Sequence, residues 1–168
     1  MKRIAYRDWI VEADPDATRN ALAIAEPMGP STCSCAHCRN FLAAREMGIV
    51  YPKEVVVFLR DIGIDPIVET EIAPFGREPS GMHVVSGWTH AVGRIVEGPE
   101  ARSPSGPDGF TLHTPAIEGA FELALLEGKA LAAPSFRDQN LIQIEFLTRL
   151  PWLLPEPDPE LSSVSHVV

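Results

Sequence analysis

Long hydrophobic runs, an excess of positive charge and an export signal are all missing from this sequence. No window of its 168 residues approaches the roughly 18 consecutive apolar residues that a membrane-spanning helix needs, so we expect no membrane partner. Lysine and arginine number 14 against 23 aspartates and glutamates, and the formal net charge of −9 argues against a nucleic-acid partner. Charges interrupt the opening residues, Met1 to Trp9, which is untypical of the apolar core of a signal peptide. We therefore expect a cytoplasmic protein.

The motifs that identify several common enzyme classes are also absent. The sequence contains no G-x-S-x-G elbow, no Walker-type glycine loop, no G-x-G-x-x-G and no H-E-x-x-H. Four carboxylates are close in sequence: Asp61, Asp65, Glu69 and Glu71. Carboxylates at a helix end and a strand start are usually solvated, so we expect these four on the surface. The sequence favours a binding or structural role over catalysis.

The first half of the chain has the patterns of one strand followed by two helices. Residues 4–12 are rich in β-favouring side chains and predict an N-terminal strand. The Ala-, Pro- and Gly-rich segment 17–32 predicts a loop with at most a brief strand or a turn of helix. Two consecutive helices are predicted near 35 to 62. The second, over 52–62, has apolar residues at i, i+3, i+4 and i+7: Val55, Phe58, Leu59 and Ile62.

The second half changes to the patterns typical of strands. The strand-like runs are 67–72, 82–96, 110–113, 121–126 and 141–150. Polar and apolar residues alternate in the last run, which predicts a sheet covered on one face, whereas 121–127 fits a strand and a short helix equally well. We predict one α+β domain over 1–152, an antiparallel β-sheet with two consecutive helices packed on one face. A flexible, Pro-rich, acidic tail is predicted over 153–168.

All three cysteines lie within six residues, in the motif C-S-C-A-H-C over residues 33–38. Three cysteines would rarely fall this close together by chance. A C-x-C-x2-C spacing at the start of a helix lets one turn supply several thiolates to a common centre, while helical amides donate hydrogen bonds to the sulfur atoms. The motif therefore favours a zinc ion bound by Cys33, Cys35 and Cys38.

A closed zinc site needs four ligands, and the chain has no second cysteine pair. The fourth ligand would be a carboxylate or one of the histidines His37, His83, His90 and His113. We favour His90, beside Trp88, as the histidine that approaches the cysteines or lines a pocket. On a regular strand His83 and His90 face opposite sides, so a joint histidine site would need a bend at Gly87. A hydrogen-bonded sheet histidine is the expected state of each.

Two other interpretations of the cysteines stay open. Cys35 and Cys38 form a C-x2-C pair at a helix start, where the helix dipole and Arg39 would lower a thiol pKa. This favours a redox pair, with His37 or His90 assisting deprotonation, although the preceding Pro/Gly loop differs from the strand of a thioredoxin-type βαβ unit. In the third interpretation the cysteines are small structural side chains beneath the helix start. Their odd number argues against a disulfide framework.

Two resemblances add to these predictions. Short blocks across most of the chain resemble a family of uncharacterised bacterial proteins: CAHCRNF at 35–41, GIDP at 63–66, GWTHAVG at 87–93, QIEF at 143–146 and LPW at 150–152. That resemblance implies a single α+β domain and no established activity. Residues 33–39, CSCAHCR, are similar to the C-x-C-x2-C-R segment of the glutathione-dependent formaldehyde-activating family, which binds zinc on a β-rich scaffold. The other cysteines of that family have no counterpart here.

Together, these patterns favour a small cytoplasmic protein with a structural zinc site at Cys33, Cys35, Cys38 and His90. One alternative is a thiol-redox enzyme or sensor that uses Cys35 and Cys38. The other is a metal-free module, immunity-like or a complex subunit, whose acidic surface meets a basic protein partner.

Overall fold

The computed structural model describes residues 1–65, 67–104, 110–112, 116–118 and 121–160. Its strands are β1 (Lys2–Tyr6), β2 (Trp9–Ala13), β3 (Glu71–Arg77), β4 (His83–Glu97), β5 (Arg102–Pro104), β6 (Phe110–Leu112), β7 (Ala116–Glu118), β8 (Phe121–Glu127) and β9 (Leu141–Leu150). Its helices are α1 (Pro15–Ala23), α2 (Ala36–Glu46) and α3 (Lys53–Asp61), with 3-10 turns η1 (Gly29–Thr32) and η2 (Pro134–Phe136). None of the helices in these ranges combines the length and the apolar character that crossing a bilayer requires.

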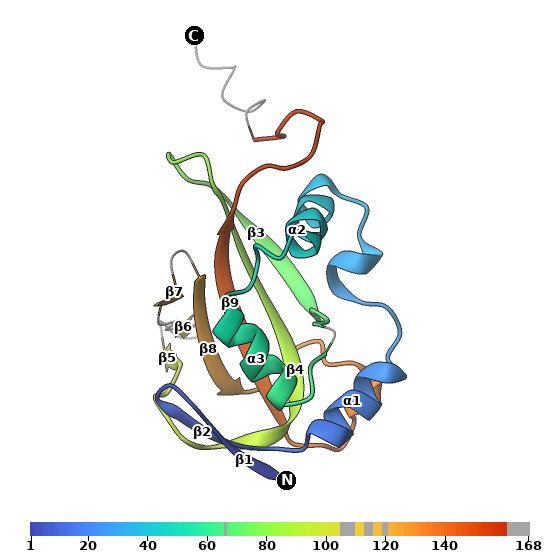
Figure 1. The fold of residues 1–168 in the computed structure, drawn as a ribbon, viewed down its shortest axis with the longest axis vertical. Helices are drawn as coiled ribbons and strands as arrows, with labels where there is room; N and C mark the ends of the chain where they lie inside the picture. The colour runs from blue at the N-terminus through green and yellow to red at the C-terminus, as the bar shows by residue number, and fades with distance from the viewer. Residues whose placement is uncertain (66, 105–109, 113–115, 119–120, 161–168) are drawn as a thin grey trace.

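The long strand β4 organises an antiparallel sheet in the order β1-β2-β4-β9-β8-β7, and β3 pairs with β4 outside this path (Figure 1). β4 pairs with β9 from His83 opposite Leu150 to Val92 opposite Leu141. Its first half also pairs with β3 and its second half with β2. The two short strands β5 and β6 form a separate ribbon.

The consecutive helices α2 and α3 lie over one face of the sheet (Figure 1). Phe41 of α2 is fully buried and stacks on Phe146 of β9, with ring centroids 6.2 Å apart. Phe58 of α3 stacks on Tyr6 of β1 at 4.1 Å. Side chains three and four residues apart lie on one side of a helix, so the apolar residues of α3 form one face. That face packs against the sheet. The structure confirms the predicted α+β class with an antiparallel sheet.

The N-terminal region differs from its prediction in two ways. The single strand predicted over 4–12 is a hairpin of β1 and β2, in which Tyr6 pairs with Trp9 and Arg7 turns the chain at φ 50°. The first part of the segment predicted as a loop, 17–32, belongs to the helix α1. The carboxylate of Asp14 accepts a hydrogen bond from the amide of Ala17 at 2.9 Å, at the start of this helix. This side chain caps α1, and Pro15 follows in its first turn.

The remaining ambiguous segments have clear structures. Residues 121–127 form the strand β8, which pairs with β9. The C-terminal segment, defined as residues 151–160, differs from the predicted flexible tail because Leu153 packs against the core and Asp158 is only 4% exposed. The side chain of Asn40 in α2 makes two hydrogen bonds to the main chain of this segment. Its Nδ2 donates to the Pro151 carbonyl at 3.0 Å, and its Oδ1 accepts from the Leu153 amide at 2.7 Å. The rest of the predicted tail, 161–168, lies outside the described residues.

Candidate metal centre

The three cysteines lie where the chain leaves η1 and enters α2, and we call them the cysteine cluster. Cys33 ends η1 in an extended conformation, with φ −102° and ψ 130°. Cys35 is the N-cap of α2, also extended, and Cys38 lies in the first helical turn. The extended residues turn the first two thiols back toward the helix start, and the helix brings the third beneath them. A purely local spacing therefore gathers all three side chains.

The three Sγ atoms of the cysteine cluster lie within 4.8 Å of one another. Two backbone amides point at sulfur: the amide of Cys35 donates to Cys33 Sγ at 3.4 Å, and the amide of Cys38 donates to Cys35 Sγ at 3.5 Å. Cys33 and Cys35 are exposed, whereas Cys38 is buried. Amides aimed at sulfur stabilise thiolates, which are the form that binds a metal or attacks a disulfide.

The surroundings shift the pKa values of two of the thiols in opposite directions. Partial burial alone would raise the pKa of Cys35, but the hydrogen bonds from the Cys38 amide, from neighbouring thiols and from the His37 amide outweigh it and lower this pKa. Burial raises the pKa of Cys38 well above its usual range, and the neighbouring Cys33 and Cys35 raise it further. Without a metal, the exposed Cys35 is therefore the preferred thiolate and Cys38 the preferred thiol.

His90 lies apart from the cysteine cluster. Among the described residues, no histidine, aspartate or glutamate brings a ligand atom within 4.8 Å of all three sulfurs. His90 Nδ1 instead lies 3.0 Å from the hydroxyl of Thr70, and its Nε2 lies 3.4 Å from Oε1 of Gln143. The imidazole is almost fully buried beside Phe136, and burial lowers its pKa. These contacts are those of a hydrogen-bonded sheet histidine.

The other histidines also have partners of their own. His37 and His83 lie close to Glu160, so this pair of histidines gathers at the C-terminal segment. His83 contacts Asp158, whereas His90 contacts Thr70, so the two histidines of β4 have separate partners. This agrees with the expectation that they face opposite sides of the strand. His113 lies outside the described residues. The carboxylate of Glu160 is a neighbour that the sequence did not suggest, because nothing local links it to either histidine.

One of the four carboxylates expected on the surface is buried. The side chain of Glu69 is 1% exposed; it is ion-paired with Arg45 and accepts a hydrogen bond from the Tyr51 hydroxyl at 2.8 Å. Burial raises the pKa of Glu69, although Arg45 and Tyr51 oppose this shift. Glu69 and Arg45 border a cavity of about 550 Å³ between α1, α3 and the chain before β3. Their mutual pairing gives these side chains a structural role.

Searches with this chain found no matching family model, no matching curated protein and no matching solved structure. The two resemblances noted in the sequence therefore stay predictions. The geometry of the cysteine cluster carries the functional argument.

Proposed function

We propose that this protein binds one zinc ion through Cys33, Cys35 and Cys38 and that the ion has a structural role. The observation that carries the proposal is the convergence of three Sγ atoms within 4.8 Å of one another. Zinc bonds thiolate sulfur at about 2.3 Å, so sulfur atoms around one tetrahedral ion lie about 3.8 Å apart. The cluster needs only small side-chain adjustments to reach that spacing.

The hydrogen bonds around the sulfurs support the same proposal. An amide hydrogen bond to sulfur stabilises the thiolate that binds a metal, and both Cys33 and Cys35 accept such a bond. Binding of zinc would ionise Cys38 as well, because a coordinated thiol loses its proton. Since Cys33 and Cys35 are exposed, the fourth position in this proposal is filled by water or by a ligand from another molecule.

A bound ion would connect the turn η1 to the start of α2. Cys33 and Cys38 belong to different elements, and Cys38 is part of the hydrophobic core while Cys33 is exposed. Zinc would thus anchor the exposed turn at Cys33 to the core-facing side of α2, and its binding energy would add to the stability of the fold. We expect chelator to lower the melting temperature of the purified protein.

The test is elemental analysis of protein purified without a His tag, with thiol titration under native and denaturing conditions. We expect one zinc per chain to be held by the thiols, which should then react slowly until the protein is denatured or chelated. Changing Cys33, Cys35 and Cys38 together to Ser should lower the zinc content by one ion per chain, whereas the control Ser34→Ala, between two of the ligands, should leave it unchanged. Three thiols that stay freely reactive after Zn²⁺ is added would contradict the proposal.

A second candidate function is a thiol-redox pair of Cys35 and Cys38. The observation that favours it is the asymmetry of the pair: Cys35 is exposed at the helix N-cap with a lowered pKa, and Cys38 is buried with a raised pKa. These are the properties of an attacking and a resolving thiol. Oxidised glutathione would accept the two electrons: the Cys35 thiolate displaces one glutathione, and Cys38, losing its proton, displaces the second as the disulfide closes.

The redox candidate predicts a reversible loss of two thiols in a metal-free sample. A Cys33→Ser variant should still lose two thiols to oxidised glutathione and regain them with dithiothreitol. The double variant Cys33→Ser/Cys38→Ser, which keeps only Cys35, should instead stop at a mixed disulfide that carries one glutathione, which mass spectrometry detects. Equal reactivity of all three thiols would contradict this candidate.

A further inference from the structure

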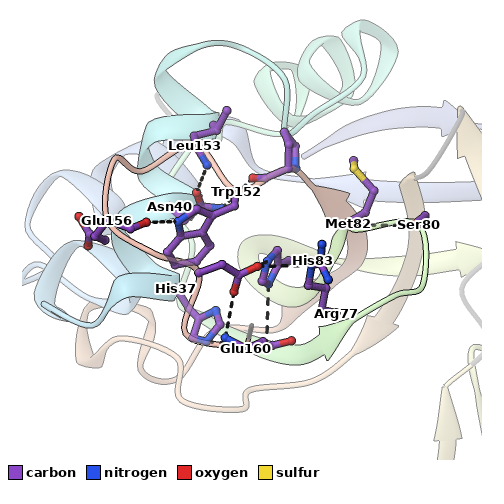
Figure 2. Close-up of polar contacts among 12 residues, drawn as sticks. His37, Asn40, Arg77, Ser80, Met82, His83, Trp152, Leu153, Glu156 and Glu160 are labelled. Carbon is purple, nitrogen blue, oxygen red and sulfur yellow. Dashed lines mark hydrogen bonds and ion pairs between the residues drawn. The ribbon is translucent and has the colours of Figure 1, made fainter. Parts of the chain in front are cut away.

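The imidazoles of His37 and His83 converge with a carboxylate from the C-terminal segment (Figure 2). His37 Nε2 and Glu160 Oε1 are 3.9 Å apart, and His83 Nδ1 lies 3.9 Å from the same oxygen. We call these three residues the histidine–carboxylate cluster. Their ligand atoms all lie within 4.8 Å of one another, and they come from α2, from the start of β4 and from residue 160.

Outer contacts fix the orientation of His83. Its Nε2 lies 2.9 Å from Oδ2 of Asp158, and this carboxylate also faces Arg77 and accepts the Glu160 amide. Because the carboxylate is an acceptor, Nε2 carries the proton and donates. In the neutral imidazole Nδ1 is then the lone-pair nitrogen, and it lies on the Glu160 side of the ring. A carboxylate–histidine pair of this kind is the usual support of a metal-ligating imidazole.

Nδ1 of His83, the ring nitrogen nearer to Glu160, is buried without a hydrogen-bond partner among the described residues. His83 is 2% exposed. A buried polar atom without a partner destabilises the folded state, because it has lost its hydrogen bonds to water. The closest carboxylate oxygen, at 3.9 Å, is too distant for a hydrogen bond and has no proton to offer when ionised. A cation placed between these atoms would give Nδ1 of His83 a partner.

The spacing of the three atoms suits a transition-metal ion. Histidine nitrogen and carboxylate oxygen bind zinc at about 2.0–2.2 Å, which places neighbouring ligand atoms of a tetrahedron about 3.3–3.6 Å apart. The two nitrogen–oxygen separations, both 3.9 Å, exceed this by a few tenths of an ångström, and the three ligand atoms all lie within 4.8 Å of one another. His37 and Glu160 are 23% and 26% exposed, so these two ligands have side-chain freedom to close and solvent reaches the cluster.

We infer that His37 Nε2, His83 Nδ1 and the carboxylate of Glu160 form a second metal site, for Zn²⁺ or a similar divalent transition ion. Two histidines, one carboxylate and a water would complete four-coordination, and the water keeps one position open for exchange. Asp158 orients His83 without touching the ion. The site is chemically distinct from the cysteine cluster because it uses nitrogen and oxygen ligands, and it does not depend on the proposed function.

Cobalt(II) is the probe that separates the two sites. Co²⁺ replaces zinc in both kinds of site, but only thiolate ligands give an intense sulfur-to-cobalt charge-transfer band. In the full-length chain we expect two Co²⁺ per protein, with the charge-transfer band accounting for one. When Cys33, Cys35 and Cys38 are all changed to Ser, one Co²⁺ should still bind and the charge-transfer band should be absent.

Variants of the cluster give the decisive comparison. In the cysteine-free background, His37→Ala and Glu160→Gln should weaken Co²⁺ binding at least about 100-fold, and Asp158→Asn about 10–100-fold. The matched control is Glu156→Gln, in the same segment, because Glu156 pairs with Arg39 outside the cluster. It should bind Co²⁺ as tightly as its parent. Circular dichroism verifies that each variant is folded.

The outcomes separate this inference from the proposed function. If the cysteine-free chain is folded but binds no Co²⁺, or if Glu160→Gln and Glu156→Gln bind it equally, the second site is refuted while the cysteine site stands. If Co²⁺ binds without a charge-transfer band in the native chain, the cysteine site fails and the second stands. Should the cysteine-free chain not fold, His37→Ala in the native chain must lower the stoichiometry from two to one and keep the charge-transfer band.

Discussion

Replacing Asn40 by alanine should release the C-terminal segment from α2. Asn40 is 3% exposed, and its amide group makes two hydrogen bonds to the main chain of this segment, at Pro151 and Leu153. Each such bond contributes about 1 kcal/mol net, and a buried group left without its partner costs more. Asn40→Ala should therefore lower the free energy of unfolding by about 2–3 kcal/mol.

Two measurements follow this change at different scales. Urea unfolding monitored by circular dichroism gives the global free energy, and amide hydrogen exchange at Leu153 reports the local opening of the segment. We expect faster exchange at Leu153 in Asn40→Ala. Asn40→Asp keeps an oxygen that accepts from the Leu153 amide but loses the donor to the Pro151 carbonyl. Exchange at Leu153 should therefore be slower in this variant than in Asn40→Ala, while the free energy of unfolding should still be lower than that of the parent.

The control for these variants is Asn20→Ala, at an exposed asparagine in α1; it should leave exchange at Leu153 unchanged and should not lower the free energy of unfolding, because alanine is the better helix former. Because Asn40 positions the segment that carries Glu160, Asn40→Ala should also weaken metal binding at the histidine–carboxylate cluster and spare the cysteine cluster. Unchanged exchange at Leu153 in Asn40→Ala would refute the reasoning, since it would show that these hydrogen bonds do not hold the segment.

Three further predictions concern the core. Burial lowers the pKa of His90 below its usual 6.5, so the unfolded chain binds the proton more readily than the folded chain. The free energy of unfolding should therefore fall as pH drops below about 6.5, by at most about 1.4 kcal/mol per pH unit. His90→Gln should flatten this pH dependence, measured by urea unfolding at several pH values. Tyr51→Phe removes the hydroxyl that donates to Glu69 and should cost about 1.5–3 kcal/mol by the same assay. Gly63→Ala should lower stability by about 3 kcal/mol in thermal and urea unfolding, because the residue has φ +96° and its Cβ would lie 2.4 Å from the carbonyl oxygen of Pro15. An unchanged pH slope, or unfolding free energies within about 0.5 kcal/mol of the parent for the other two, would contradict these accounts.

The fold was most predictable where its signals are local. The apolar period of α3 and the alternation in β9 depend on neighbouring residues, and their predicted positions agree with the structure. The helix α1 was missed because the Ala-, Pro- and Gly-rich composition of 17–32 predicts a loop, and because an aspartate followed by a proline, as at Asp14 and Pro15, is also typical of a turn. The same two residues begin a helix, as N-cap and first-turn proline, and only their backbone geometry decides between these roles.

The same distinction separates the two candidate metal sites. The cysteine cluster was predictable because all of its ligands lie between residues 33 and 38, where one helix start determines their spacing. The histidine–carboxylate cluster needs the sheet register to place His83, and it needs the Asn40 contacts to bring Glu160 back across α2. No local sequence pattern predicts that Glu160 lies beside the two histidines, since the acidic, Pro-rich composition of 153–160 is typical of a mobile tail.

The pairing of β4 with β9 sets the order in which the two clusters can form during synthesis. Strand β4 cannot complete its central pairing until residues 141–150 have been made, and this long separation makes sheet closure a late event in folding. The three cysteines are available as soon as the first turn of α2 emerges, so a nascent chain could capture metal there long before the sheet exists. Glu160 is the last residue of the histidine–carboxylate cluster to be added, after residues 141–150, so this cluster can exist only in a chain whose sheet is already able to close.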